Sequence, residues 1–143
     1  MRYSYPIRLD PEPDGSAINL SFPDVPGALT FGDNEAEALA MAEDCLIAAL
    51  RGYMKLGKAI PAPSPSRGRP VVALPSLAAA KLALYAAMRE ARISNVELAR
   101  RLGATENVVR KLLDLDHRSH IGQVEAALGK LGVRLEVVAR TAA

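Results

Sequence analysis

The chain has 143 residues, of which 50% are hydrophobic and 24% are charged, and its formal net charge is +2. These proportions exclude a disordered chain and provide enough apolar surface for a buried core. No apolar run approaches the ~20 residues that a membrane span requires, and a single cysteine, Cys45, excludes an internal disulfide. We therefore expect a soluble, cytoplasmic protein in which Cys45 is a buried helical thiol without a reactive role.

The charge is distributed unevenly along the chain. Residues 1–63 contain five Lys or Arg against nine Asp or Glu, whereas residues 64–143 contain thirteen against seven. An acidic part joined to a basic part indicates two different partners, and the basic part suits a polyanion such as nucleic acid. Residues 57–70 contain four prolines, which predicts an extended linker region between a domain of residues 1–66 and one of residues 71–143.

Two runs of alternating apolar residues predict a β-hairpin at the N-terminus. The first run is Tyr3, Tyr5, Ile7 and Leu9, and the second is Ile18, Leu20 and Phe22. The turn residues of DPEPDGS separate the two runs, and Pro6 is typical of an edge strand. A third short strand is expected at residues 29–31, and PVVAL, at residues 70–74, is expected to add another.

A long helix is predicted after residue 34. Asn34 is the expected N-cap, Glu37 is placed to complete a capping box, and Gly57 is the expected stop. The spacing predicts a helix face that packs on the sheet, made of Leu39, Ala42, Leu46, Ala49 and Tyr53. Strands with one covering helix predict a small α+β module.

The N-terminal module offers no catalytic set. Asp10, Asp14, Asp24 and Asp33 each lie in a turn that contains Pro or Gly, where Asp is favoured because it hydrogen-bonds its own backbone. No glycine-rich phosphate loop and no nucleophile elbow occur in the chain. We expect no enzyme activity, no cofactor and no metal site.

The C-terminal module is predicted to be helical. Ser76 can cap a first helix with Leu82, Tyr85 and Met88 on its inner face. The stretch NVELARRLGATENVVRKLL then satisfies the requirements of a helix-turn-helix, with a small residue at Ala99, a turn at Gly103 and apolar positions that hold the two helices together. These apolar positions are Leu98, Leu102, Ala104, Val109 and Leu112. A helical hairpin that only packs remains the structural alternative.

If the motif binds DNA, the second of its helices reads the groove. Thr105 then caps this helix, and the outward residues are of types that contact bases and phosphates. They are Glu106, Asn107, Arg110 and Lys111, followed by His117 and Arg118 near the sugar-phosphate backbone. His117 and His120 have no nearby cysteine and do not complete a tetrahedral metal set.

The last part of the chain predicts a helix and a strand. Val124, Leu128 and Leu131 mark the helix, and Gly132 ends it. In VRLEVVAR, Val133, Leu135 and Val137 alternate with polar residues as in a strand. Because no partner strand is evident in a helical module, we expect these three residues to pair with another copy of the chain, giving a homodimer or homotetramer.

Three segments together resemble the HicB-type antitoxins of bacterial type II toxin–antitoxin systems, in the subgroup with a C-terminal helix-turn-helix. They are FPDVPGALTFGDNEAEALAMAEDCL, KAIPAPS, and LPSLAAAKLALYAAMREARISNVELARRLG with VVRKLLDLDHRS. The resemblance implies an N-terminal partial ribonuclease H-like fold without the nuclease's acidic set. One departure is Phe31, which stands where the family usually has a polar residue before the Gly32-Asp33 turn.

The same resemblance implies a function. The N-terminal module would cover a small HicA-type RNase toxin that has a double-stranded-RNA-binding-like fold and a catalytic histidine. The C-terminal module would repress the shared operon by binding its operator, which would bring the protein to the nucleoid. For the toxin-binding residues we consider the exposed PDVPGA loop, Pro23, Asp24, Val25, Pro26 and Gly27, together with the Pro6 edge strand.

Two alternatives remain open from the sequence. A free-standing transcription regulator with a ligand-binding N-terminal domain would share every feature of the C-terminal half. A nuclease on the ribonuclease H-like frame would require a carboxylate cluster that the strands do not supply.

Overall fold

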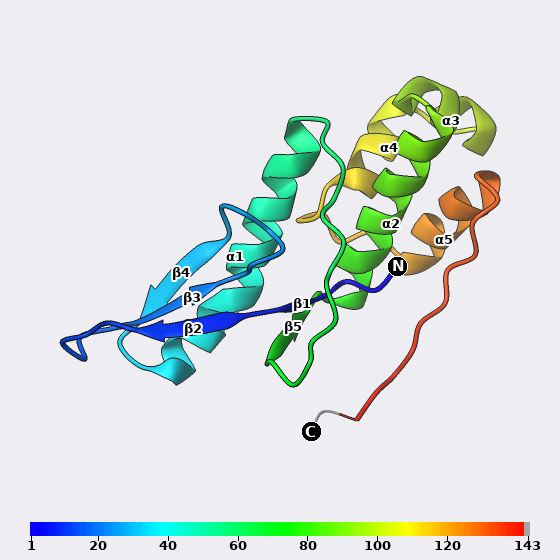
Figure 1. The fold of residues 1–143 in the computed structure, drawn as a ribbon. Coiled ribbons are helices and arrows are strands. Elements are labelled where there is room, and N and C mark those ends of the chain that lie inside the picture. The colour runs from blue at the N-terminus through cyan, green and yellow to red at the C-terminus, as the bar shows by residue number, and fades with distance from the viewer. Residues whose placement is uncertain (142–143) are drawn as a thin grey trace. The chain divides into compact units, whose positions relative to one another are not determined.

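The computed structural model describes residues 1–141, which divide into two compact units, one of residues Met1–Leu74 and one that begins at Pro75. The first unit contains five short strands and one long helix, α1 (Glu35–Lys55), and the second contains four helices (Figure 1). The strands are β1 (Ser4–Pro6), β2 (Arg8–Pro11), β3 (Ile18–Ser21), β4 (Leu29–Gly32) and β5 (Val71–Ala73). The α+β class predicted from the sequence is confirmed.

Strands β2, β3 and β4 form an antiparallel sheet in that order, which confirms a hairpin of β2 and β3. The first half of the run predicted for its first strand instead forms β1, which pairs with β5 in a separate sheet. Leu20 pairs with Leu9 on one side and Thr30 on the other, and its fully buried side chain lies on the face that α1 covers. Successive residues of a strand point to opposite faces. The opposite face of β4 therefore carries Leu29 and Phe31, which are both exposed.

The N-terminus of α1 is held by the predicted capping box. The Asn34 side chain accepts a hydrogen bond from the Glu37 backbone N–H at 3.0 Å, and the Glu37 carboxylate accepts one from the Asp33 N–H at 2.8 Å. Gly57, at a φ of 65°, follows the helix, as the expected stop requires. Capping is a local effect, which is why the sequence pattern located both ends of this helix.

The face of α1 that packs inward agrees only in part with the predicted one, because Ala42 and Leu46 are buried as predicted and the other predicted residues are not. The buried residues are Ala38, Ala42, Leu46 and Leu50, whereas Leu39 is 41% exposed. Apolar residues of α1 itself lie on most sides of the helix, so their periodicity alone does not select one face. The small side chains of Ala38 and Ala42 let the first half of this face approach the sheet closely, and packing on the sheet therefore decides the orientation of the helix.

The two-stranded sheet of β1 and β5 ties the proline-rich segment to the first unit. Pro6 pairs with Val71 and Tyr5 with Val72, and the Tyr5 hydroxyl donates to the Pro61 carbonyl at 2.7 Å. The first compact unit consequently extends to Leu74, beyond the linker region of residues 57–70. Hydrogen bonds from the Tyr5 hydroxyl to Pro61, and from Ser64 to the Asp24 carboxylate, hold this segment against its own unit.

The second unit is built from α2 (Ser76–Ala91), α3 (Asn95–Leu102), α4 (Glu106–Leu113) and α5 (Ile121–Lys130). Its core takes residues from all four helices, and Leu84, Leu98, Val109 and Leu128 are fully buried in it. The predicted core of α3 and α4 is thus confirmed. None of the helices within residues 1–141 is long and apolar enough to cross a membrane.

One predicted detail of the second unit is wrong. Ser76 is the first residue of α2 and Pro75 occupies the N-cap without a side-chain cap bond. Residues 133–140 form no strand within the single chain, where none of the described segments provides a hydrogen-bonded neighbour, and their pairing with another copy stays a prediction.

Candidate nucleic-acid interface and partner surface

Helices α3 and α4 are joined by the three residues Gly103, Ala104 and Thr105. Gly103 adopts a φ of 64° and ends α3, a conformation that glycine reaches without steric strain. The Thr105 hydroxyl accepts a hydrogen bond from the Val108 N–H at 3.3 Å, so the predicted cap of α4 is confirmed. The arrangement has the short turn and the shared apolar core that a helix-turn-helix requires.

Helix α4 has one buried and one exposed face. Val109 and Leu112 are buried, whereas Asn107, Arg110 and Lys111 are exposed on the other side. An amide, a guanidinium and an ammonium are groups of the types that can hydrogen-bond base edges and neutralise phosphates. The structure thus brings together the principal residues that the sequence placed on a recognition helix.

Glu106 restrains Arg110. The Arg110 guanidinium donates to the Glu106 carboxylate at 2.9 Å, one helical turn away. Exposed pairs of this spacing contribute only ~0.3–0.5 kcal/mol, so a guanine or a phosphate can displace the carboxylate at little cost. Until then, the pair limits the number of side-chain conformations that Arg110 samples.

The loop between α4 and α5 carries the two remaining predicted contacts. His117 and Arg118 are exposed, and the His117 Nδ1 lies 3.0 Å from the Ser119 hydroxyl oxygen. Asp114 starts this loop and accepts a hydrogen bond from the Asp116 N–H at 2.9 Å, which forms a compact turn. Arg118 therefore projects from a structured loop.

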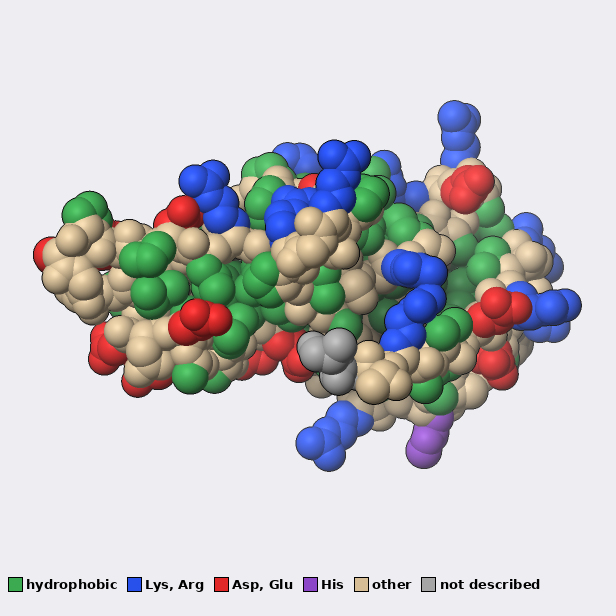
Figure 2. All heavy atoms as spheres, turned by 60° about the horizontal axis from the view of Figure 1, so that its bottom comes forward, with side chains coloured by type: hydrophobic (Ala, Val, Ile, Leu, Met, Phe, Trp, Pro, Cys, Tyr) green, Lys and Arg blue, Asp and Glu red, His purple; other side chains and the backbone are tan. Residues whose placement is uncertain are grey.

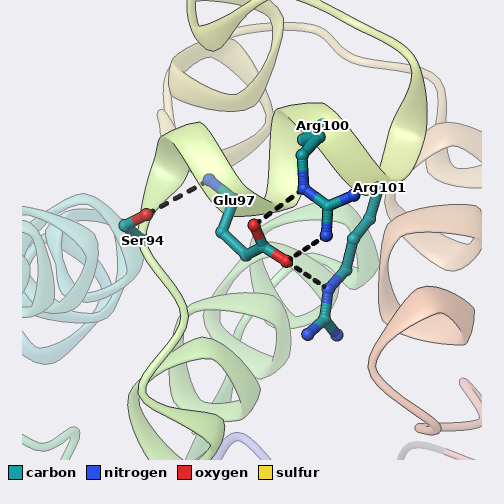
Figure 3. A network of polar contacts seen from close by, with 4 residues as sticks. All are labelled: Ser94, Glu97, Arg100 and Arg101. Atoms are coloured by element: carbon teal, nitrogen blue, oxygen red, sulfur yellow. Dashed lines mark hydrogen bonds and ion pairs between the residues drawn. The ribbon is translucent and has the colours of Figure 1, made fainter.

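A second basic group lies on α3 and was not among the predicted contacts. Glu97 accepts hydrogen bonds from Arg100 at 2.7 and 3.0 Å and from Arg101 at 3.0 Å, and its own N–H donates to Ser94 (Figure 3). The two guanidiniums lower the pKa of Glu97 to about 2. If the motif binds DNA, the consecutive arginines in the last turn of α3 are the sequence signal for this group, because the first helix of a helix-turn-helix crosses the DNA backbone.

In the first unit, the predicted contact loop at residues 23–27 has two distinct parts. Val25 is fully buried, and the Asp24 carboxylate accepts hydrogen bonds from the Ser64 N–H at 2.8 Å and the Ser64 hydroxyl at 2.9 Å. Pro23, Pro26 and Gly27 are exposed. Asp24 and Val25 thus fix the loop and the proline-rich segment, and only the other three residues present a surface.

Next to this loop, the edge strand β4 presents large apolar side chains to solvent. Leu29 is 70% exposed and Phe31 is 65% exposed. A shallow groove of about 510 Å³ runs beside the strand and is lined by residues that include Gly27, Leu29, Met41 and Cys45. Figure 2 shows hydrophobic side chains with acidic ones beside them on the left-hand part of the molecule, which the first unit forms. Exposed apolar groups clustered in this way are typical of interaction sites.

The acidic residues of the first unit do not converge. Asp14 accepts a hydrogen bond from the Ser16 N–H at 2.9 Å, and Asp10 pairs with Arg8 at 3.0 Å. Hydrogen bonding with the Ser16 side chain, and then with its backbone, lowers the pKa of Asp14. Within residues 1–141, no three His, Cys, Asp or Glu side chains come together as metal ligands. Cys45 is half-buried, and burial raises the pKa of its thiol, which disfavours the reactive thiolate.

The C-terminal segment holds the residues expected to mediate self-association. Leu135 is partly buried against the core of the second unit, whereas Val133 is exposed and Val137 is 69% exposed. The expected alternation is therefore only partly present in the single chain. Leu135 anchors the segment, and the valines beyond it are left on the surface.

Comparison with known proteins identifies the family. The model of the HicB_like antitoxin of bacterial toxin-antitoxin systems matches residues 4–83. Antitoxin HicB 2 of Photorhabdus laumondii is 41% identical over 135 residues, which cover 94% of this chain and 95% of the relative. Antitoxin HicB of Escherichia coli K12 is 36% identical over 135 residues, covering 94% and 97%. The chain therefore belongs to the HicB-like antitoxin family of bacterial toxin–antitoxin systems.

Proposed function

We propose that this antitoxin represses its own operon by inserting α4 into the major groove of operator DNA. The observation that carries the proposal is the exposed face of α4, where Asn107, Arg110 and Lys111 lie opposite the buried Val109 and Leu112. Residues 75–143 also contain eleven Lys or Arg against seven Asp or Glu, a charge that favours association with a polyanion. Arg118 in the loop after α4, and Arg100 and Arg101 on α3, would contact phosphates beside the groove.

The test is a titration of the full-length protein against the DNA upstream of its own gene and against a scrambled duplex of equal length. We expect the upstream DNA to bind more tightly at every salt concentration, because base contacts add to the phosphate contacts that both duplexes share. Equal affinity for the two duplexes would contradict operator recognition. Binding to neither would contradict the nucleic-acid function altogether.

We propose further that the first unit is not catalytic and neutralises a HicA-type RNase toxin by covering it with the edge of β4 and the loop at residues 23–27. Leu29 and Phe31 would supply the apolar centre of the interface. Residues 1–63 carry four more acidic than basic side chains, which complements the positive charge expected of a protein that binds RNA. The presence of antitoxins among the relatives favours this role over that of a ligand-binding regulator.

Replacing Leu29 and Phe31 by threonine tests the toxin-binding surface, because threonine keeps the preference for a strand and removes the apolar area. Losing the burial of one large apolar side chain costs roughly 1.5–3 kcal/mol, so each variant should bind the toxin at least tenfold more weakly. Leu56→Thr is the matched control, since Leu56 is also 70% exposed but lies at the C-terminal end of α1. Equal losses in all three variants would place the interface elsewhere.

We also propose that the chain forms a homodimer or homotetramer through residues 133–140, with Val133, Leu135 and Val137 in a strand paired with its counterpart. Pairing would satisfy the backbone groups of a segment that forms no ladder within one chain, and a two-fold axis would satisfy both copies alike. Light scattering on residues 75–143, with and without residues 133–143, measures this. An unchanged mass after the deletion would exclude the segment as the interface.

A further inference from the structure

Lys81, on α2, is a buried charged residue with no exposed surface. Its Nζ donates to the backbone carbonyls of Lys111 at 2.8 Å, Asp114 at 2.6 Å and His117 at 2.8 Å. The Ser119 hydroxyl oxygen is a fourth acceptor at 2.9 Å. A buried ammonium is unfavourable unless it is fully hydrogen-bonded, and these acceptors provide for all three of its hydrogens.

The four acceptors come from one continuous part of the chain. Lys111 is in the last turn of α4, Asp114 is the C-cap, and His117 and Ser119 belong to the loop that leads to α5. The last carbonyls of a helix have no partner within the helix, and a positive charge at that end is also favoured by the helix dipole. A single side chain of α2 thus holds the end of the recognition helix and the loop after it.

These carbonyls do not depend on Lys81 alone. The Lys111 carbonyl also accepts from the Asp114 N–H at 3.3 Å, the Asp114 carbonyl from the His117 N–H at 3.1 Å, and the His117 carbonyl from the Ser119 N–H at 2.9 Å. The turns of the loop are therefore closed by their own backbone. What Lys81 adds is the connection between this preformed loop and α2.

We propose that Lys81 is a positioning residue for operator binding, which fixes where Lys111 and Arg118 meet the DNA backbone. This inference rests on the proposed nucleic-acid function. Lys81 holds the carbonyl of Lys111 itself and the carbonyl of His117, the residue immediately before Arg118. Lys111, three residues before Asp114, and Arg118, four residues after it, are thereby held at a constant separation. The phosphates of a DNA backbone have a fixed spacing, so contacts with two of them require such a separation.

The test compares Lys81→Met with the wild type in the full-length protein. Methionine fills similar volume without donors, so the core should remain packed while the loop loses its connection to α2. We expect operator affinity to fall on the order of tenfold and the slope of log K against log salt to decrease by about one to two units, since Lys111 and Arg118 no longer reach phosphates together. In this background, Arg118→Ala should have little additional effect.

Val124→Ala is the structural control, because Val124 is fully buried in the same core but makes no contact with the loop through a polar group. It should lower the melting temperature and leave the salt slope unchanged. If Lys81→Met does not fold, Ser119→Ala removes one of the four acceptors and should lower both affinity and slope to a smaller extent. A Lys81→Met or Ser119→Ala protein that folds and retains the wild-type affinity and slope would overturn the inference, whereas a wild type that does not bind the operator would overturn the proposed function itself.

Discussion

Gly32 lies where the end of β4 meets the first turn of α1. A Cβ atom at this position would collide with the Ala38 backbone nitrogen and would lie 2.8 Å from the Glu37 Cβ. The obstructing atoms all belong to α1 and most are backbone atoms, so they cannot move aside as the end of a flexible side chain could. The small residue is therefore required by the close approach of helix and sheet.

We expect Gly32→Ala to lower the free energy of unfolding by roughly 1–3 kcal/mol, the usual cost of excess volume in a packed region. Gly52→Ala is the matched control, because Gly52 lies within α1 and an added Cβ there meets nothing within 4 Å. Alanine favours a helix over glycine, so the control should be stabilised by up to about 1 kcal/mol. Urea denaturation of both variants measures the difference, and a stable Gly32→Ala protein would show that α1 can shift away from the sheet.

Arg110 and Lys111 are adjacent on α4, and we expect their replacement to change DNA binding in different ways. Arg110→Ala should cost ~1–3 kcal/mol on the operator and relax the preference at one or two base pairs, because a guanidinium that bonds a base edge carries sequence information. Lys111→Ala should weaken all duplexes alike and reduce the salt slope by about one unit. Titrations against single-base operator variants distinguish the two. An Arg110→Ala protein with the wild-type sequence preference would mean that Arg110 does not read a base.

At the scale of a helix, the stability of α3 depends on the protonation state of Glu97. Arg100 and Arg101 lower the pKa of Glu97 from its ordinary value of 4.5 to about 2. A carboxylate with a lowered pKa contributes stability above its unfolded pKa and loses that contribution as the pH falls toward the folded one. The contribution of Glu97 is therefore complete above about pH 5 and is lost between about pH 4.5 and pH 2.

Melting temperatures at pH 7 and pH 3 should consequently differ less in Glu97→Gln than in the wild type. Glu97→Gln also removes the negative charge that Arg100 and Arg101 share, so non-specific DNA binding at neutral pH should increase. Glu125→Gln, on the exposed side of α5, controls for the loss of one carboxylate. If the melting temperature of Glu97→Gln falls in acid by as much as that of the wild type, the hydrogen bonds and ion pairs of Figure 3 do not contribute to stability.

Features determined by neighbouring residues could be predicted from the sequence, and features determined by distant contacts could not. Asn34, Thr105 and Gly103 act within a few residues of themselves, and the structure confirms their predicted roles. Of the predicted inner face of α1, Ala42 and Leu46 are buried but Leu39 is not, because the sheet, and not the helix, selects the face. The contacts of Lys81 span 30 residues or more, and a lysine among alanines gave no signal that it would be buried.

At the scale of the molecule, the position at which the chain is divided determines whether the first unit survives alone. Residues 1–74 retain the β1–β5 sheet, including the hydrogen bond from the Leu74 N–H to the Tyr3 carbonyl at 3.0 Å. A fragment of residues 1–66 lacks β5 and the Pro70 carbonyl that accepts from Ile7. Each such hydrogen bond contributes roughly 0.5–1.5 kcal/mol, so the loss of the strand should destabilise the shorter fragment markedly.

We therefore expect residues 1–74 to fold and to protect cells from the toxin, and residues 1–66 to do so weakly or not at all. Circular dichroism and co-expression with the toxin test both fragments. Tyr5→Phe in residues 1–74 is an intermediate case, because it removes only the hydrogen bond to Pro61. Equal protection by the two fragments would show that β5 is dispensable. A folded 1–74 fragment that gives no protection would contradict the proposal that the first unit neutralises the toxin.

The exposed edge of β4 also affects the solubility and lifetime of the protein while no partner is bound. An unpaired strand edge with Leu29 and Phe31 beside it is a template on which further strands can add, including those of other copies or of partly unfolded chains. Newly made antitoxin in excess of its toxin should thus be prone to aggregation and to degradation by quality-control proteases, whereas a toxin that covers this edge, as we propose, would protect it. The lifetime of the antitoxin in the cell would then follow the supply of toxin, without any dedicated sensor in the chain.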